Sequence, residues 1–212
     1  MKNKTLFWVR FFIVIAMIVA GIALYPSLPE TIPTHWGLSG EADAWGPKLL
    51  GILIGPVIAT FMLLLFPLLS KLDPKKENYE KFKGSWEVLQ TALIGFFAYV
   101  FALQKYFSLN EQYSYLMGRL IMGGVGALFI VMGNLLGKIK QSFFIGFRTP
   151  WTLSDPEVWQ KTHRVAGWAM LIGGVAFVLE ALVWQFVVPV FVVSIVSIVV
   201  IPMVYSYLIS KK

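Results

Sequence analysis

The sequence predicts an all-α polytopic membrane protein with about six transmembrane helices and with both chain ends in the cytoplasm. Composition is the first of three observations behind this prediction. Hydrophobic residues make up 58% of the 212 residues and charged residues only 14%, whereas a soluble domain carries roughly 25% charged residues. The chain cannot cover itself with polar surface, so we expect its solvent to be lipid.

The second observation is a set of apolar stretches long enough to cross a bilayer, which takes about 20 residues. Six stretches qualify: 6–25, 49–70, 88–107, 117–137, 165–184 and 186–208. Only Gln185 separates the last two, which predicts a tight helical hairpin. The first stretch is longer than the apolar region of a usual signal peptide, so we expect it to be retained as a helix.

The third observation is the placement of the basic residues, which collect in the cytoplasmic loops of membrane proteins. In a six-helix arrangement 14 of the 18 lysine and arginine residues fall on one side of the membrane. They are Lys2, Lys4, Lys71, Lys75, Lys76, Lys81, Lys83, Lys138, Lys140, Arg148, Lys161, Arg164, Lys211 and Lys212. The opposite side holds only Lys48, Lys105 and Arg119, while Arg10 lies inside the first stretch and can extend toward the cytoplasm. The net charge of +7 therefore indicates topology and contact with anionic lipid, and not direct nucleic-acid binding.

The connection between the first two stretches, residues 26–48, is unusual for a simple connector. Its prolines favour an extended chain and its glycines favour turns. It also carries His35, Trp36, Asp43 and Trp45. Two interpretations stay open: an interfacial cap whose tryptophans lie at the level of the lipid headgroups, or an extracytoplasmic recognition loop.

The predicted cytoplasmic connection between the fourth and fifth stretches, which we call the inner loop, is denser in functional side chains. Residues 154–157 have the form of a capping box with a proline in the first turn, so we expect a helix that starts there and continues into the fifth stretch. Trp159, Thr162 and Ala166 would share one face of that helix. Just before it, residues 146–152 combine a guanidinium, two hydroxyls and an indole.

These residues resemble the SdpI family of bacterial membrane proteins. The resemblance rests on Asn134, Gly146, Arg148, Thr149, Pro150, Trp151, Thr152, Trp159 and His163. Gln141 and Ser142 depart from it, since many relatives have an asparagine before the Gly-x-Arg sequence. The first two helices and their loop resemble a short domain of unknown function that often precedes the SdpI module. The resemblance thus implies two domains, 1–72 and 73–212.

The resemblance also implies a function. The family's namesake confers immunity to a secreted peptide toxin, the sporulation-delaying protein, and acts as a receptor that holds a cytoplasmic repressor at the membrane. The expected partners are therefore the lipid bilayer, a secreted peptide toxin and a winged-helix repressor, in the bacterial cytoplasmic membrane. From the residues of the inner loop we expect Arg148, Thr149, Trp151, Thr152 and Trp159 to form one compact cytoplasmic surface, or else to brace the loop against the fifth helix.

Glu180 is the only acid well inside a predicted helix, and Arg119 lies just inside another. Ionisable residues in such positions are functional candidates by default. Counted from the inner ends of their helices at 1.5 Å per residue, Arg119 lies at about 27 Å and Glu180 at about 24 Å. Because their depths are nearly equal, we expect the two side chains to pair. The pair would either join two helices or sense a toxin or an ion.

Catalytic chemistry has little support in the sequence. It contains no cysteine, and its two histidines are predicted on opposite sides of the membrane, where they could not share a metal ion. No HExxH, Walker or GxSxG motif is present. We therefore expect no enzyme, cofactor or metal site. The alternative to an immunity protein is a small transporter of a hydrophobic peptide or lipid, for which inverted repeats would be expected.

Overall fold

Six long helices form the body of the protein, as predicted. The computed structural model describes residues 4–211, so Lys2 and Lys212 lie outside the described residues. The helices are α1 (Lys4–Leu24), α2 (Lys48–Leu72), α4 (Lys83–Leu109), α5 (Met117–Leu136), α7 (Pro156–Val183) and α8 (Val187–Ser210). Each is long and apolar enough to cross a membrane. The prediction of an all-α, multi-pass membrane protein is confirmed.

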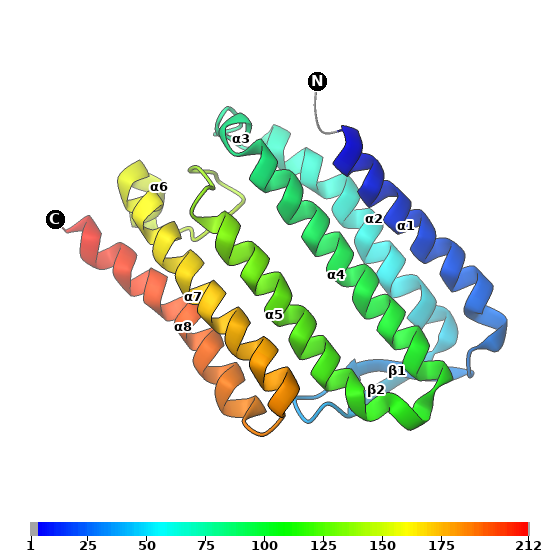
Figure 1. Ribbon diagram of the computed structural model, residues 1–212. Coiled ribbons are helices and arrows are strands. Elements are labelled where there is room, and N and C mark those ends of the chain that lie inside the picture. Colours follow the sequence, from blue (N-terminus) through cyan, green and yellow to red (C-terminus); the bar gives the residue numbers. More distant parts are fainter. Residues whose placement is uncertain (1–3, 212) are drawn as a thin grey trace.

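The six helices form two groups of three, which Figure 1 shows side by side. In the first group α1, α2 and α4 pack on one another around Met17, Leu63 and Phe101. In the second group α7 packs between α5 and α8. The spatial grouping thus places α4 with the first two helices, whereas the predicted division at residue 72 places it with the last three. That division of the sequence into two domains stays a prediction.

Short elements connect the helices. They are η1 (Tyr25–Ser27), β1 (Thr31–Trp36), β2 (Ala42–Pro47), α3 (Asn78–Lys81), η2 (Glu111–Leu116) and α6 (Pro150–Ser154). β1 and β2 form an antiparallel hairpin with an irregular register around His35. The sequence did not predict this hairpin, because prolines and glycines inside a short segment argue against a strand.

The long predicted helix after residue 155 is α7. Asp155 caps it, since its carboxylate accepts hydrogen bonds from the backbone N–H groups of Glu157 (2.6 Å) and Val158 (3.3 Å). Pro156 follows at the first helical position, where a missing N–H costs nothing. The helix then continues without a break to Val183, as expected.

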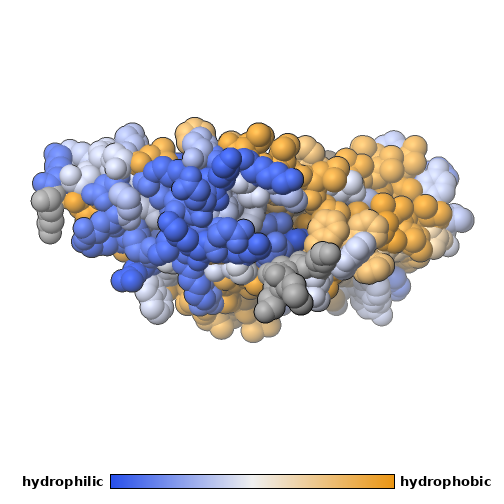
Figure 2. Space-filling model, turned by 90° about the horizontal axis from the view of Figure 1, so that it is seen from above, coloured by the Kyte–Doolittle hydropathy of each residue, from blue (hydrophilic) through white to orange (hydrophobic). Residues whose placement is uncertain are grey.

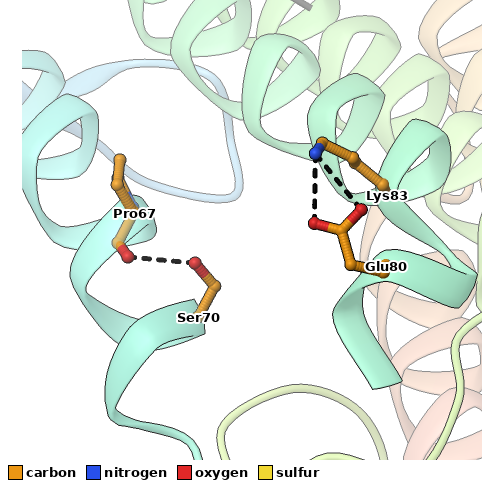
Figure 3. Close-up of polar contacts among 4 residues, drawn as sticks. All are labelled: Pro67, Ser70, Glu80 and Lys83. Carbon is orange, nitrogen blue, oxygen red and sulfur yellow. Dashed lines mark hydrogen bonds and ion pairs between the residues drawn. The ribbon is translucent and has the colours of Figure 1, made fainter. Parts of the chain in front are cut away.

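The two ends of the bundle differ in chemistry. We call the end with both chain termini, α3 and α6 the basic end, and the opposite end, with the strands, the hairpin end. Figure 2 looks onto the basic end, where hydrophilic residues gather over the central part. Figure 3 shows two local contacts there: the Ser70 hydroxyl donates to the Pro67 carbonyl (2.9 Å), and Lys83 pairs with Glu80 (3.1 Å). The Ser70 contact lies near the end of α2, and the Lys83–Glu80 pair lies at the start of α4.

The orientation of the two ends is open to a direct test. The chain contains no cysteine, so single cysteines can be introduced without background labelling. We expect Asp43→Cys to react with an impermeant maleimide in intact cells, and Ser154→Cys to react only after permeabilisation, because basic residues are retained in the cytoplasm. Labelling in the opposite order would contradict the predicted orientation.

Candidate functional site

The motif that carries the family resemblance forms a tight turn over α7. Gly146 has φ +105°, a conformation that side chains disfavour. A Cβ atom on Gly146 would lie 2.3 Å from His163 Nε2 and 3.0 Å from the Trp159 ring. Only glycine fits here, because the backbone of the turn passes directly over these two side chains.

His163 and Trp159 form the floor of this turn. Their rings stack with centroids 4.0 Å apart, and both side chains are almost completely buried. The backbone N–H of Phe147 donates to His163 Nε2 (3.0 Å), while Nδ1 lies 2.8 Å from the Trp159 carbonyl. Because Nε2 accepts and a carbonyl can only accept, His163 is neutral and carries its proton on Nδ1. This geometry makes His163 a positioning group for the turn.

The hydroxyls of the motif cap the short helix α6. Thr149 accepts a hydrogen bond from the Thr152 N–H (3.2 Å), and the Thr152 hydroxyl lies 2.9 Å from the Thr149 N–H. The reciprocal pair is a capping box, with Pro150 at the first helical position. The Thr149 hydroxyl also lies 3.1 Å from that of Ser206 in α8. The motif therefore links the inner loop to both α7 and α8.

The remaining motif residues are more accessible. Arg148 is exposed, and its guanidinium donates a hydrogen bond to the Phe143 carbonyl within the inner loop (2.9 Å). Trp151 is half-buried and packs against Tyr207, with ring centroids 5.0 Å apart. Asn134 is exposed near the end of α5 and donates to the Ile130 carbonyl (3.1 Å).

The prediction that five motif residues form one compact surface needs correction. Thr152 and Trp159 are buried, and Trp159 Nε1 donates to the Ile139 carbonyl (2.9 Å) inside the fold. Polar atoms of a buried motif that are satisfied internally stabilise the loop and are not available to a partner. The bracing interpretation therefore describes Thr152 and Trp159, and only Arg148 is freely exposed.

A second set of contacts connects the inner loop to the first helix group, at the end of α2. The Asp73 carboxylate is buried and accepts hydrogen bonds from the Tyr79 hydroxyl (2.9 Å) and from the N–H groups of Phe143 and Phe144 (2.8 and 3.2 Å). Burial and the Asp73 hydrogen bond raise the pKa of Tyr79 well above its usual value, so the phenol keeps the proton that it donates.

Gln141 completes this connection. Its amide nitrogen donates to the carbonyls of Thr152 and Leu153 (2.7 and 2.8 Å), while its oxygen accepts from Lys75. Asn78 donates to the Gln141 carbonyl (2.8 Å). We call residues 73–79, with their contacts to residues 141–144, the strap. The residue that departs from the family pattern thus lies at the junction of the two helix groups.

The predicted ion pair between Arg119 and Glu180 is not formed. Arg119 Nη1 donates to the Leu182 carbonyl (3.2 Å), and its guanidinium lies over the Trp184 ring. The buried Glu180 instead accepts from the backbone N–H of Phe186 (2.6 Å), which closes the turn between α7 and α8. The prediction was made from depth alone, and depth does not determine the direction in which a side chain points.

Two other charged residues inside the helices have partners that the sequence did not predict. Arg10 is 3% exposed, and its guanidinium pairs with Glu87 of α4 (2.7 Å). Lys105 is 2% exposed; its ammonium donates to the Gly51 carbonyl (2.8 Å) and to Gln104 (2.9 Å). Both contacts join α4 to α1 or α2. Predicting them would have required knowledge of which helices are neighbours.

At the hairpin end the four predicted loop residues lie on the two strands. His35 and Asp43 form an exposed pair, with 2.5 Å between Nδ1 and Oδ1. Trp36 is half-buried and Trp45 is 56% exposed. β1 is fixed to the helices by Ile32, whose side chain fills the space above Gly51, and by Gln104, which donates to the Pro33 carbonyl (2.7 Å).

A cleft of about 570 Å³ lies between this hairpin and η2. We call it the outer cleft. Aromatic and acidic side chains line it: Trp36, Trp45, Tyr115, Glu41 and Glu111. Neither glutamate is within 4.0 Å of a basic group in residues 4–211. The cleft therefore combines apolar surface with uncompensated negative charge.

Comparison with known proteins gives family matches for two segments of the chain. The model of the SdpI/YfhL protein family matches residues 138–206, which contain the motif turn, α6, α7 and most of α8. This part of the chain is therefore similar to the SdpI/YfhL family. A domain of unknown function, DUF1648, matches residues 12–60, which include the hairpin. Both resemblances seen in the sequence are confirmed.

A curated relative is similar over nearly the whole length of the chain. It is the immunity protein SdpI of Bacillus subtilis (strain 168), which is 29% identical over 201 residues, or 94% of this chain and 93% of the relative. No solved structure gave a match. The similarity covers both the outer cleft and the braced motif.

Proposed function

We propose that this protein confers immunity to a secreted, membrane-active peptide toxin, from the cytoplasmic membrane of a bacterium. The full-length similarity to an immunity protein is the observation that carries the proposal. The outer cleft supports it, because toxin arriving from outside would meet the hairpin end first in the predicted orientation. The proposal involves no catalytic step.

The chemistry of the outer cleft indicates the kind of peptide that it binds. Glu41 and Glu111 attract a cationic segment, and an exposed cleft of one charge sign raises the rate of encounter with its ligand. Trp36, Trp45 and Tyr115 offer rigid aromatic surface of the kind that dominates binding hot spots. A peptide that carries lysine or arginine beside apolar residues fits both features.

A receptor role is part of the same proposal. In it the basic end holds a cytoplasmic winged-helix repressor once toxin occupies the outer cleft. Arg148 supports this role because it is the exposed motif residue, and its guanidinium can exchange a loop carbonyl for a carboxylate of a partner. The buried motif residues would transmit a change, and would not contact the repressor.

The outer cleft can be tested in a Bacillus strain that lacks its own immunity protein and is exposed to the purified sporulation-delaying peptide. Expression of the wild-type chain should raise the inhibitory concentration of the peptide. The double substitution Glu41→Gln/Glu111→Gln should lower that protection several-fold, because it removes the attraction for a cationic peptide without changing the shape of the cleft.

Glu77→Gln/Glu80→Gln is the matched control, since it removes two exposed carboxylates outside the cleft lining. We expect it to protect like the wild type at equal protein abundance. Equal loss in both double variants would contradict the role of the cleft. Protection accompanied by toxin efflux from preloaded cells would instead favour the transporter alternative.

A further inference from the structure

The basic end contains a second hollow, separate from the motif turn and from the outer cleft. It has a volume of about 250 Å³ and lies between α5 and α7. Its lining is Gly133, Asn134, Gly137, Lys138, Arg164, Gly167, Trp168 and Leu171. We call it the inner groove.

Glycines create the inner groove. A Cβ on Gly133 would lie 2.6 Å from the Gly167 carbonyl, and a Cβ on Gly167 would lie 2.7 Å from the Gly133 carbonyl. The two backbones therefore touch at this crossing. Beside it Gly137 also lacks a side chain, so the flanking residues of α5 and α7 surround an open space instead of filling it.

The inner groove has positive charge that the protein does not neutralise. Lys138 and Arg164 are exposed, and neither makes a side-chain hydrogen bond or an ion pair with any of residues 4–211. The neighbouring cation Lys161, in contrast, pairs with Glu157 (2.6 Å). Asn134 uses one N–H in its own helix and retains a second donor. Two cations and an amide donor thus converge without an anion.

The depth of the inner groove places it at the boundary between headgroups and hydrocarbon. Trp168 is 66% exposed beside it, and tryptophan is enriched at headgroup level in membrane proteins. Lys138 follows the end of α5, whereas Leu171 lies about one turn further along α7 than Trp168. One side of the groove is therefore cationic, and the other is apolar.

We propose that the inner groove binds the phosphate of an anionic phospholipid from the leaflet at the basic end. Lys138 and Arg164 contact the phosphodiester, Asn134 donates a hydrogen bond to the headgroup, and Trp168 with Leu171 packs against the start of an acyl chain. Basic pockets between transmembrane helices are suited to this ligand. The volume of the groove accommodates a headgroup and not a whole lipid, so the acyl chains lie along the outer surfaces of α5 and α7.

The site can be tested by titrating delipidated, detergent-purified protein with phosphatidylglycerol and counting bound lipid by native mass spectrometry. Removal of one cation near a membrane surface weakens binding about five-fold. Lys138→Gln/Arg164→Gln should therefore weaken the binding of phosphatidylglycerol roughly 25-fold. Phosphatidylcholine should bind weakly to both proteins, because its headgroup has no net charge.

Lys71→Gln/Lys76→Gln is the matched control. It removes two exposed cations from the same end of the bundle, outside the groove lining, and should bind phosphatidylglycerol like the wild type. Equal weakening in both double variants, or none in the groove variant, would overturn the proposal. Thermal stabilisation of the wild type by inorganic phosphate alone, equal to that by the lipid, would overturn it too. Because both groove cations are exposed, the variant is expected to fold; Lys138→Gln alone provides the same comparison with a five-fold effect.

Discussion

Gly174→Ala should strongly destabilise the protein, although it adds a single methyl group. A Cβ on Gly174 would lie 2.6 Å from the Gly126 carbonyl and 2.9 Å from the Ile130 nitrogen, distances that real Cβ atoms do not show. Both obstacles are backbone atoms of α5, so no side-chain rotation relieves the clash. The helices must separate, and overpacking of this kind costs about 1–3 kcal/mol.

The effect should extend along the whole contact between α5 and α7. Gly126 faces Gly174, and Gly133 faces Gly167, which lie seven residues later in α5 and seven residues earlier in the antiparallel α7. Seven residues are close to two helical turns, so both glycine pairs lie on one seam. Transmembrane helices depend on such close approach, because lipid supplies no hydrophobic force between them. Widening one pair therefore loosens the other.

The measurement is the temperature of unfolding in detergent, monitored as the loss of monomeric protein on heating. Gly95→Ala is the control, since a Cβ there meets no atom within 4 Å and alanine is the better helix former. We expect it to unfold at the wild-type temperature or above. A Gly174→Ala protein as stable as Gly95→Ala would show that the backbone contact is not required.

The transmembrane helices were predictable because each follows from one local quantity, the length of an apolar stretch. The predicted start of the long fifth helix was also correct, since the capping residue and the following proline are adjacent in the sequence. The glycine contacts between α5 and α7 were not predictable, because they depend on the antiparallel register of the two helices.

Side-chain partners across helices were not predictable in this way. Arg119 and Glu180 were predicted at similar depth, yet each bonds a backbone group near the α7–α8 turn. Arg10 finds Glu87 because α1 packs on α4, and the sequence order of the helices does not indicate that contact. The burial of the motif residues was not predictable either, since an exposed loop and a braced loop have the same composition.

Asp73→Ala should cause the largest loss among single substitutions at the basic end. The buried carboxylate accepts from the Tyr79 hydroxyl, from two backbone N–H groups of the inner loop, and from the Lys75 N–H (2.7 Å). Alanine leaves these donors without an acceptor, and each unsatisfied buried group costs about 1–3 kcal/mol. Water can reach some of them once the loop loosens, so we expect a total loss of about 3 kcal/mol or more.

The loss should be concentrated in the strap and in the loop that it holds, because α5 and α7 keep their own contact. Hydrogen exchange should accelerate first in residues 141–153, and protease should cleave there before the helices unfold. Asp73→Asn should be intermediate, since an amide retains one acceptor oxygen but its nitrogen cannot accept. Glu77→Ala removes an exposed carboxylate from the strap and should leave the exchange rates of residues 141–153 unchanged.

If Asp73→Ala exchanges like Glu77→Ala, then the strap does not hold the inner loop. If only Asp73→Ala also loses toxin protection at normal abundance, then immunity requires the two helix groups to be connected at the basic end.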